Sequence, residues 1–139
     1  RINDGMGAHV ADRVARQMMR RGFPVVGSRI LVMGLSFKEN CPDLRNSRVI
    51  DVIRELQSLN ATVEVWDPWV NADEALEEFE LRVEAAEPAP GRYDAVIVAV
   101  GHQEFIEGGV ERARALGRPN AVLFDVKGLY PCDATDGRL

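Results

Sequence analysis

Apolar residues recur along the chain in two patterns, one with helical spacing and one in short continuous runs. In the first segment Met6, Val10, Val14 and Met18 fall on one face of a helix, and Gly22 ends it. Short apolar runs then predict buried strands, with amphipathic helices between them. The predicted strands are 30–33, 62–66, 95–100 and 121–124, and the predicted helices are 47–59, 73–79 and 110–116.

This alternation indicates an α/β fold, an open parallel sheet with helices on both faces. The first helix precedes the alternation, so we assign residues 1–25 to the end of a preceding region. Residues 26–139 form the α/β domain in this interpretation. The tail from Pro131 onward is polar, and we expect it to be loose.

Composition narrows the class of protein. The chain has 139 residues, of which 46% are hydrophobic, enough for one domain with one core. Its 17 Lys and Arg against 22 Asp and Glu argue against a nucleic-acid partner, which would need a basic face. No apolar run approaches the roughly 20 residues that cross a bilayer, and no signal peptide is visible. We therefore expect a cytoplasmic protein with no membrane partner, and the first residue, Arg1, suggests a cut fragment.

Ligands of such sheets bind beyond the carboxyl ends of the strands, so the loops after Gly34, Asp67, Val100 and Phe124 are candidates. The glycine-rich fingerprint of a dinucleotide site is missing, because residues 34–38 read Gly-Leu-Ser-Phe-Lys. We therefore expect this domain not to hold a whole NAD by itself.

The loop after the first strand offers other groups. Phe37 can pack against a base or sugar, and Lys38 lies where a phosphate or ribose would sit. Arg45 and Ser47 precede a helix, whose N-terminus favours anions. Lys127 follows the last strand at the same edge of the sheet, so it can join Lys38 around an anion. The alternative for each of these cations is a solvated surface side chain.

Three further residues leave alternatives open. Asp67 either grips a ribose or bonds its own backbone in a turn before Pro68, and we favour the turn. His102 follows a strand end, where it either contacts a ligand or plays no part in binding. Cys41 is near basic groups but has no evident base, so an incidental thiol is favoured over a nucleophile. Cys41 and Cys132 are too few for a disulfide framework or a zinc site.

Several motifs resemble one known family. Residues 32–47, Val-Met-Gly-Leu-Ser-Phe-Lys-Glu-Asn-Cys-Pro-Asp-Leu-Arg-Asn-Ser, resemble the signature that begins the C-terminal domain of UDP-glucose/GDP-mannose dehydrogenases. Residues 1–6 resemble the end of that family's central dimerisation region. Residues 66–68, Trp-Asp-Pro, and residues 124–128, Phe-Asp-Val-Lys-Gly, resemble its strand endings.

The resemblance implies a Rossmann-like domain that binds a nucleotide sugar. Members of the family oxidise the C6 alcohol of the sugar to a carboxylate with NAD, which the N-terminal domain binds, and use a cysteine upstream of this domain. It implies that Lys38 contacts the substrate, beside Phe37, and that Arg45 reaches the NAD. Lys127 falls where many members have an arginine, so its role as a substrate contact is in question. No residue here matches the catalytic cysteine.

The loop sequence at residues 39–43 resembles the branch that acts on UDP-N-acetylhexosamines in bacterial surface polysaccharide synthesis. The resemblance also implies a homodimer formed through the first helix. The leading hypothesis is thus the UDP-sugar-binding, non-catalytic part of an NAD-dependent UDP-sugar 6-dehydrogenase. The alternative is a stand-alone flavodoxin-like binding or regulatory module. A complete small NAD enzyme is disfavoured by the missing glycines.

Overall fold

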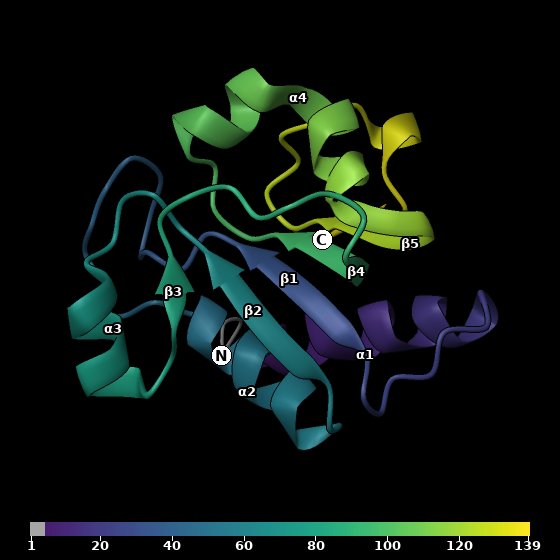
Figure 1. The fold of residues 1–139 in the computed structure, drawn as a ribbon, viewed down its shortest axis with the longest axis horizontal. Coiled ribbons are helices and arrows are strands. Elements are labelled where there is room, and N and C mark those ends of the chain that lie inside the picture. The colour runs from purple at the N-terminus through teal and green to yellow at the C-terminus, as the bar shows by residue number, and fades with distance from the viewer. Residues whose placement is uncertain (1–4) are drawn as a thin grey trace.

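A parallel sheet with helices on both faces forms the domain, as the sequence predicts (Figure 1). The computed structural model describes residues 5–139, and in this range six strands pair in the order β3-β2-β1-β4-β5-β6. The elements are α1 (Met6–Arg20), β1 (Arg29–Met33), α2 (Val49–Ser58), β2 (Thr62–Trp66), α3 (Ala72–Phe79), β3 (Val83–Glu84), β4 (Tyr93–Val98), α4 (Gln103–Leu116), β5 (Gly117–Asp125) and β6 (Gly137–Arg138). Because β2 lies on one side of β1 and β4 on the other, the strand order reverses between β1 and β4. That reversal is the point at which open α/β sheets bind ligands.

The core lies on both faces of the sheet. Along β1, Ile30 and Val32 pack into the layer of α1, α2 and α3, whereas Leu31 and Met33 pack into the layer of α4. Successive side chains of a strand point to opposite faces, so a strand covered on both sides must be apolar throughout. This explains why the sequence shows continuous apolar runs. Each fully buried side chain of this size contributes about 1.5–3 kcal/mol.

Helix α1 packs beside α2 on the lower face of the sheet in Figure 1. Its buried residues Val10, Val14 and Met18 belong to the same core as the strands. The apolar face of α1, the helix through which a homodimer is expected, is therefore covered by other parts of this chain. The boundary between residues 1–25 and 26–139, and the dimer, remain predictions. Residues 1–4, part of the predicted dimerisation motif, lie outside the described range.

The C-terminal tail is ordered, so the prediction of a loose segment after Pro131 is wrong. A 3₁₀ turn at Cys132–Ala134 leads into β6, which pairs with β5. The Asp136 carboxylate accepts the Leu123 N–H at 2.8 Å and forms ion pairs with Arg21 of α1 and Arg114 of α4. These contacts fix the tail against helices from both layers. Burial alone would raise the pKa of Asp136, but the N–H and the two cations hold it below its usual range.

Besides β6, the sequence prediction missed β3 and shortened α4. Strand β3 is a two-residue edge strand, too short to show a hydrophobic period. Helix α4 begins at Gln103 rather than Val110, and it is broken at Gly109, where φ is 81° and ψ is 167°. Because glycine has a low helix propensity, the two glycines at 108 and 109 kept the first half of the helix out of the prediction. No helix in residues 5–139 is long and apolar enough to cross a bilayer.

We expect the contact between α1 and α2 to require glycine at position 7. A Cβ on Gly7 would lie 2.6 Å from the Asp51 Cβ and 2.7 Å from its carbonyl carbon. Gly7→Ala should therefore lower the free energy of unfolding by about 1–3 kcal/mol, in spite of alanine's better helix propensity. Gly108→Ala is the matched control, because a Cβ there meets only the flexible Arg112 side chain at 3.4 Å. Urea unfolding measures both values. A free energy of unfolding for Gly7→Ala equal to or greater than that of Gly108→Ala would contradict the packing argument.

Candidate functional site

The Asp67 carboxylate, directly after β2, lies at the centre of the carboxyl edge of the sheet and has no exposed surface. Its Oδ2 accepts the backbone N–H groups of Leu35 at 2.7 Å and Ser36 at 3.1 Å. Its Oδ1 accepts the N–H groups of Trp69 at 2.7 Å and Val70 at 3.2 Å. One carboxylate thus holds the turn after β1 and the turn after β2 together. The preference for a turn residue over a ribose ligand at Asp67 agrees with this burial.

The charge on Asp67 is stabilised from several directions. Burial alone would raise its pKa, but hydrogen bonds from His102 and from the N–H groups of Leu35 and Trp69 outweigh burial and hold the pKa below its usual range. Asp67 is therefore a buried anion at neutral pH, and its charge is balanced by donors that the fold supplies.

This anion occupies the place that a ligand phosphate takes in a dinucleotide-binding domain. There, the N–H groups of the turn after the first strand point at the pyrophosphate. Here the N–H groups of Leu35 and Ser36 are bound to Asp67. Gly34, with φ at 99°, serves packing instead, because a Cβ there would lie 2.5 Å from the Val100 Cβ. The N–H groups of this turn are therefore already paired within the protein and are not free for a pyrophosphate.

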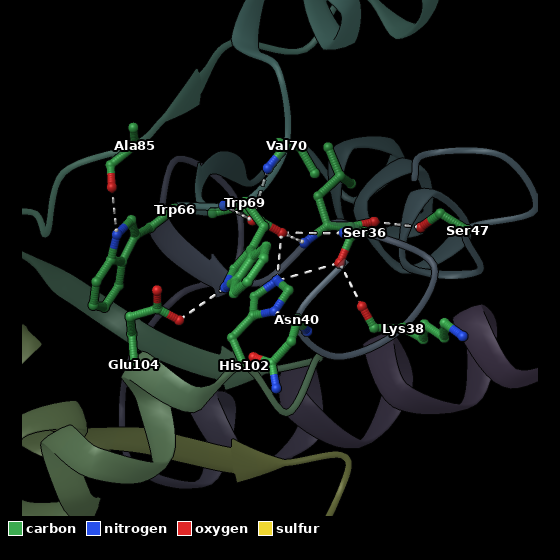
Figure 2. A network of polar contacts seen from close by, with 12 residues as sticks. Ser36, Lys38, Asn40, Ser47, Trp66, Trp69, Val70, Ala85, His102 and Glu104 are labelled. Atoms are coloured by element: carbon green, nitrogen blue, oxygen red, sulfur yellow. Dashed lines mark hydrogen bonds and ion pairs between the residues drawn. The ribbon is translucent and has the colours of Figure 1, made fainter. Parts of the chain in front are cut away.

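His102 completes the buried network at the edge of the sheet (Figure 2). Its Nδ1 accepts the Asn40 N–H at 2.9 Å, so the ring proton is on Nε2, which lies 3.0 Å from Asp67 Oδ2 and 3.2 Å from Ser36 Oγ. Ser36 Oγ donates its proton to the Lys38 carbonyl at 2.9 Å. This arrangement is no nucleophilic triad, since Asp67 and Ser36 share one ring nitrogen and the serine is buried.

The structure brings two of the predicted substrate contacts together. Phe37 and Lys127 line one pocket of about 200 Å³, with Arg48 at the first turn of α2. Its floor includes Val100, so the pocket lies where the strand order reverses. Lys38 is exposed beside Phe37 but does not line the pocket. Arg48 was not singled out from the sequence, although its position at a helix start, directly after Ser47, was the available signal.

Arg45 does not join that pocket. Its guanidinium makes two hydrogen bonds of 3.0 Å to the Asp43 carboxylate, and it lines a separate hollow with Cys41, Glu74 and Glu78. The hydrogen bond from Arg45 lowers the pKa of Asp43. The Arg45 side chain is 84% exposed, so solvent weakens this pair. Cys41 is half-buried and unbridged, in keeping with an incidental thiol.

The basic side chains of the described residues differ in whether they form ion pairs. Within residues 5–139 neither Lys38 nor Lys127 forms an ion pair, whereas Arg21, Arg29 and Arg118 pair with carboxylates. In the same range no group of three or more His, Cys, Asp or Glu side chains is placed to hold a metal ion. The lysines are thus free to meet an anionic ligand.

Another hollow, of about 380 Å³, lies under α4 on the opposite face. Trp66 and Phe105 form part of its apolar wall, and Glu104 and Arg112 stand at its rim. None of the four predicted site residues lines this hollow. We therefore place the candidate site at the Phe37 and Lys127 pocket, where the strand order reverses.

We expect Asp67→Asn to destabilise the domain at neutral pH by about 3 kcal/mol, because an amide cannot accept all of these buried N–H groups. Since folding lowers the pKa of Asp67, its charge stabilises the fold above the pKa of the unfolded carboxyl, near pH 4, and this contribution is lost as the pH falls further. The variant should therefore lose less stability than the wild type on acidification. Chemical unfolding at several pH values measures both effects.

Asp12→Asn serves as the control for that experiment. The Asp12 carboxylate is 59% exposed and pairs only with Arg16 of the same helix. Its removal should change the free energy of unfolding by less than about 1 kcal/mol. If Asp67→Asn were no more destabilising than Asp12→Asn, the Asp67 carboxylate would not hold the two turns.

Similarity to known proteins agrees with this geometry. Residues 31–131 match the model of the UDP-glucose/GDP-mannose dehydrogenase family, UDP binding domain. The whole chain is 48% identical to a UDP-N-acetyl-D-glucosamine 6-dehydrogenase from Pseudomonas aeruginosa and covers 33% of that protein. It is 43% identical to the enzyme of the same name from Salmonella typhi and covers 32% of it. The chain therefore spans about a third of the length of these curated relatives.

Solved structures share the fold. A UDP-D-ManNAc dehydrogenase from Pyrococcus horikoshii superposes with a TM-score of 0.78 at 21% identity, over 99% of this chain and 31% of that one. An NDP-N-acetyl-D-galactosaminuronic acid dehydrogenase from Methanosarcina mazei Go1 gives a TM-score of 0.80 at 21% identity, over 96% of this chain and 29% of that one. By the match of residues 31–131 to the family model, this chain belongs to the UDP-glucose/GDP-mannose dehydrogenase family.

Proposed function

We propose that this chain is the nucleotide-sugar-binding domain of an NAD-dependent dehydrogenase that oxidises the C6 alcohol of a UDP-sugar to a uronate. The observation that carries the proposal is the pocket that joins Phe37 and Lys127, next to the exposed Lys38, where the strand order reverses. The names of the relatives from Pseudomonas aeruginosa and Salmonella typhi support a UDP-N-acetylhexosamine as the sugar nucleotide.

The chemistry of the pocket suits a nucleoside diphosphate. Phe37 is 51% exposed, so its ring is open to a base or sugar. Lys127 and Arg48 supply positive charge on the pocket wall, and Lys38 supplies it at the neighbouring surface. Diphosphate oxygens bind such cations through charge-assisted hydrogen bonds. Because Lys127 and Lys38 make no ion pair in residues 5–139, binding would not have to break one.

The size of the pocket supports a shared site. Its volume of about 200 Å³ is below the roughly 300–1,000 Å³ of small-molecule pockets. A second domain that closes over the open side would complete it, and the chain's coverage of only 33% of a relative leaves room for one. In this proposal the other domain supplies the catalytic cysteine and most of the NAD contacts. We keep the division at residues 1–25 and 26–139, and a homodimer through α1, as parts of the same proposal.

Arg45 is the residue of this chain that we propose to approach the NAD. NAD supplies the hydride acceptor, and a guanidinium would bind its phosphate or ribose oxygens. The turn after β1 is closed to it by Asp67, which supports a second domain as the principal holder of NAD. Arg45 lies on the far end of the same loop as Lys38, so one loop would face both ligands.

We expect Lys38→Ala in the complete dehydrogenase to weaken UDP binding by about 1.5–3 kcal/mol, the worth of a charged hydrogen bond, or roughly 10- to 150-fold in Kd. Calorimetric titration with UDP measures the change. Arg82→Ala removes an equally exposed cation away from this edge of the sheet and should leave the Kd unchanged. Equal affinities of the Lys38→Ala variant and the wild type would refute the assignment of Lys38.

Arg45→Ala should separate the two ligands. Because Arg45 lies outside the Phe37 and Lys127 pocket, the Kd for UDP should stay within twofold of the wild type. The KM for NAD should rise roughly fivefold, a value near 1 kcal/mol that suits an exposed charge. Steady-state kinetics with NAD varied at saturating UDP-sugar give the test. A changed UDP affinity with an unchanged KM for NAD would reverse the proposed assignment of Arg45.

A further inference from the structure

His102 is buried against the loop that carries Lys38, although it comes from a different part of the chain. It directly precedes α4, and none of its surface is exposed. The Phe105 ring meets it edge-on at 5.4 Å between centroids, and the Trp69 ring lies over it at 6.0 Å with 24° between the planes. Both ring nitrogens have polar partners, so the orientation of the imidazole is fixed from all sides.

The hydrogen bonds of His102 bracket Lys38. On one side its Nε2 meets Ser36 Oγ at 3.2 Å, and that hydroxyl donates to the Lys38 carbonyl. On the other side its Nδ1 accepts the N–H of Asn40 at 2.9 Å. The Asn40 side chain returns a bond, because its Oδ1 accepts the Gln103 N–H at 2.8 Å. The segment 36–40 is therefore tied to the start of α4 at both of its ends.

The backbone of this segment is held by these bonds and by the Phe37 N–H, which donates to the Asp43 carbonyl at 2.7 Å. Asn40 has a φ of 54°, a left-handed conformation that costs energy for any residue other than glycine. Phe37 and Lys38 lie between the two tied positions and have exposed side chains that make no ion pair among the described residues. The placement of both side chains follows the backbone of residues 36–40, and His102 contacts that backbone directly at Asn40 and through Ser36 at Lys38.

We propose that His102 is a positioning residue for substrate binding, which holds Phe37 and Lys38 in the conformation that receives the UDP-sugar without touching it. This inference rests on the proposed function and adds the residue that organises the site in advance. A pre-organised loop loses less conformational entropy on binding, so its loss should appear in the affinity for UDP and in the KM for the UDP-sugar. The KM for NAD and the kcat should change little.

Two substitutions test the inference in the complete dehydrogenase. His102→Leu removes the polar contacts of both ring nitrogens, to Asn40, Ser36 and Asp67, whereas the side-chain oxygen of His102→Asn can still accept the Asn40 N–H. We expect the Kd for UDP to rise roughly tenfold in the leucine variant, and by less in the asparagine variant. Amide hydrogen exchange at Asn40 should accelerate in the leucine variant and be partly restored in the asparagine variant. His9→Gln, on the exposed side of α1, is the control and should match the wild type.

A double-mutant cycle with Lys38→Ala distinguishes positioning from general destabilisation. If His102 acts through the loop of Lys38, His102→Asn should weaken UDP binding much less in the Lys38→Ala background than in the wild type. Additive effects, or an unchanged Kd in both His102 variants, would overturn the positioning role while the proposed function stands. A wild-type enzyme that binds neither UDP nor a UDP-sugar would overturn both proposals. If the leucine variant does not fold, the asparagine variant and its double-mutant cycle with Lys38→Ala still test the positioning role.

Discussion

The carboxylate of Asp67 lies wholly inside the protein and accepts backbone N–H groups from two turns at once. A buried carboxylate is stable only when donors of this kind replace its water. Four N–H groups and His102 do so here. The turns after β1 and β2 and the start of α4 are therefore mutually dependent. Loss of any one partner would leave another buried group without a hydrogen bond.

That internal anion decides which ligand the edge of the sheet can accept. A related sheet with a glycine-rich first turn offers its free N–H groups to a pyrophosphate. In this chain Leu35 and Ser36 have already given theirs to Asp67, so an external phosphate must be bound by side chains instead. The cations at hand beyond the turn are Lys38, Arg48 and Lys127. In our proposal this Rossmann-like framework presents one half of a nucleotide-sugar site in place of a dinucleotide site.

Much of this could be foreseen from the sequence, and the failures have physical causes. Strands buried on both faces are visible in the sequence as apolar runs. The rule for carboxyl ends placed Lys127 at the same edge as the loop after β1, but the prediction paired it with Lys38, whereas the pocket joins it to Phe37. Strand β6 is held by side-chain contacts to Asp136 from distant helices, which no local pattern reports. The role of Asp67 in the turn after β2 could be predicted from the sequence, since an Asp-Pro pair predicts a turn. Its bonds to the first turn and to His102 arise only when three strand ends converge.

Lys38 and Lys127 at the candidate site differ from several arginines of the chain in their ion pairs within the protein. The arginines with fixed partners serve the fold: Arg21 ties the tail to α1, and Arg29 and Arg118 pair with carboxylates at strand starts. A guanidinium suits such planar, two-pronged pairs. An ammonium group is a compact, strongly hydrated charge on a flexible stem, and it is less suited to such two-pronged pairs. Lys38 and Lys127 therefore stay exposed and without an ion pair in residues 5–139. His102, directly before α4, accepts the Asn40 N–H, and in our proposal this bond supports the backbone that carries Lys38.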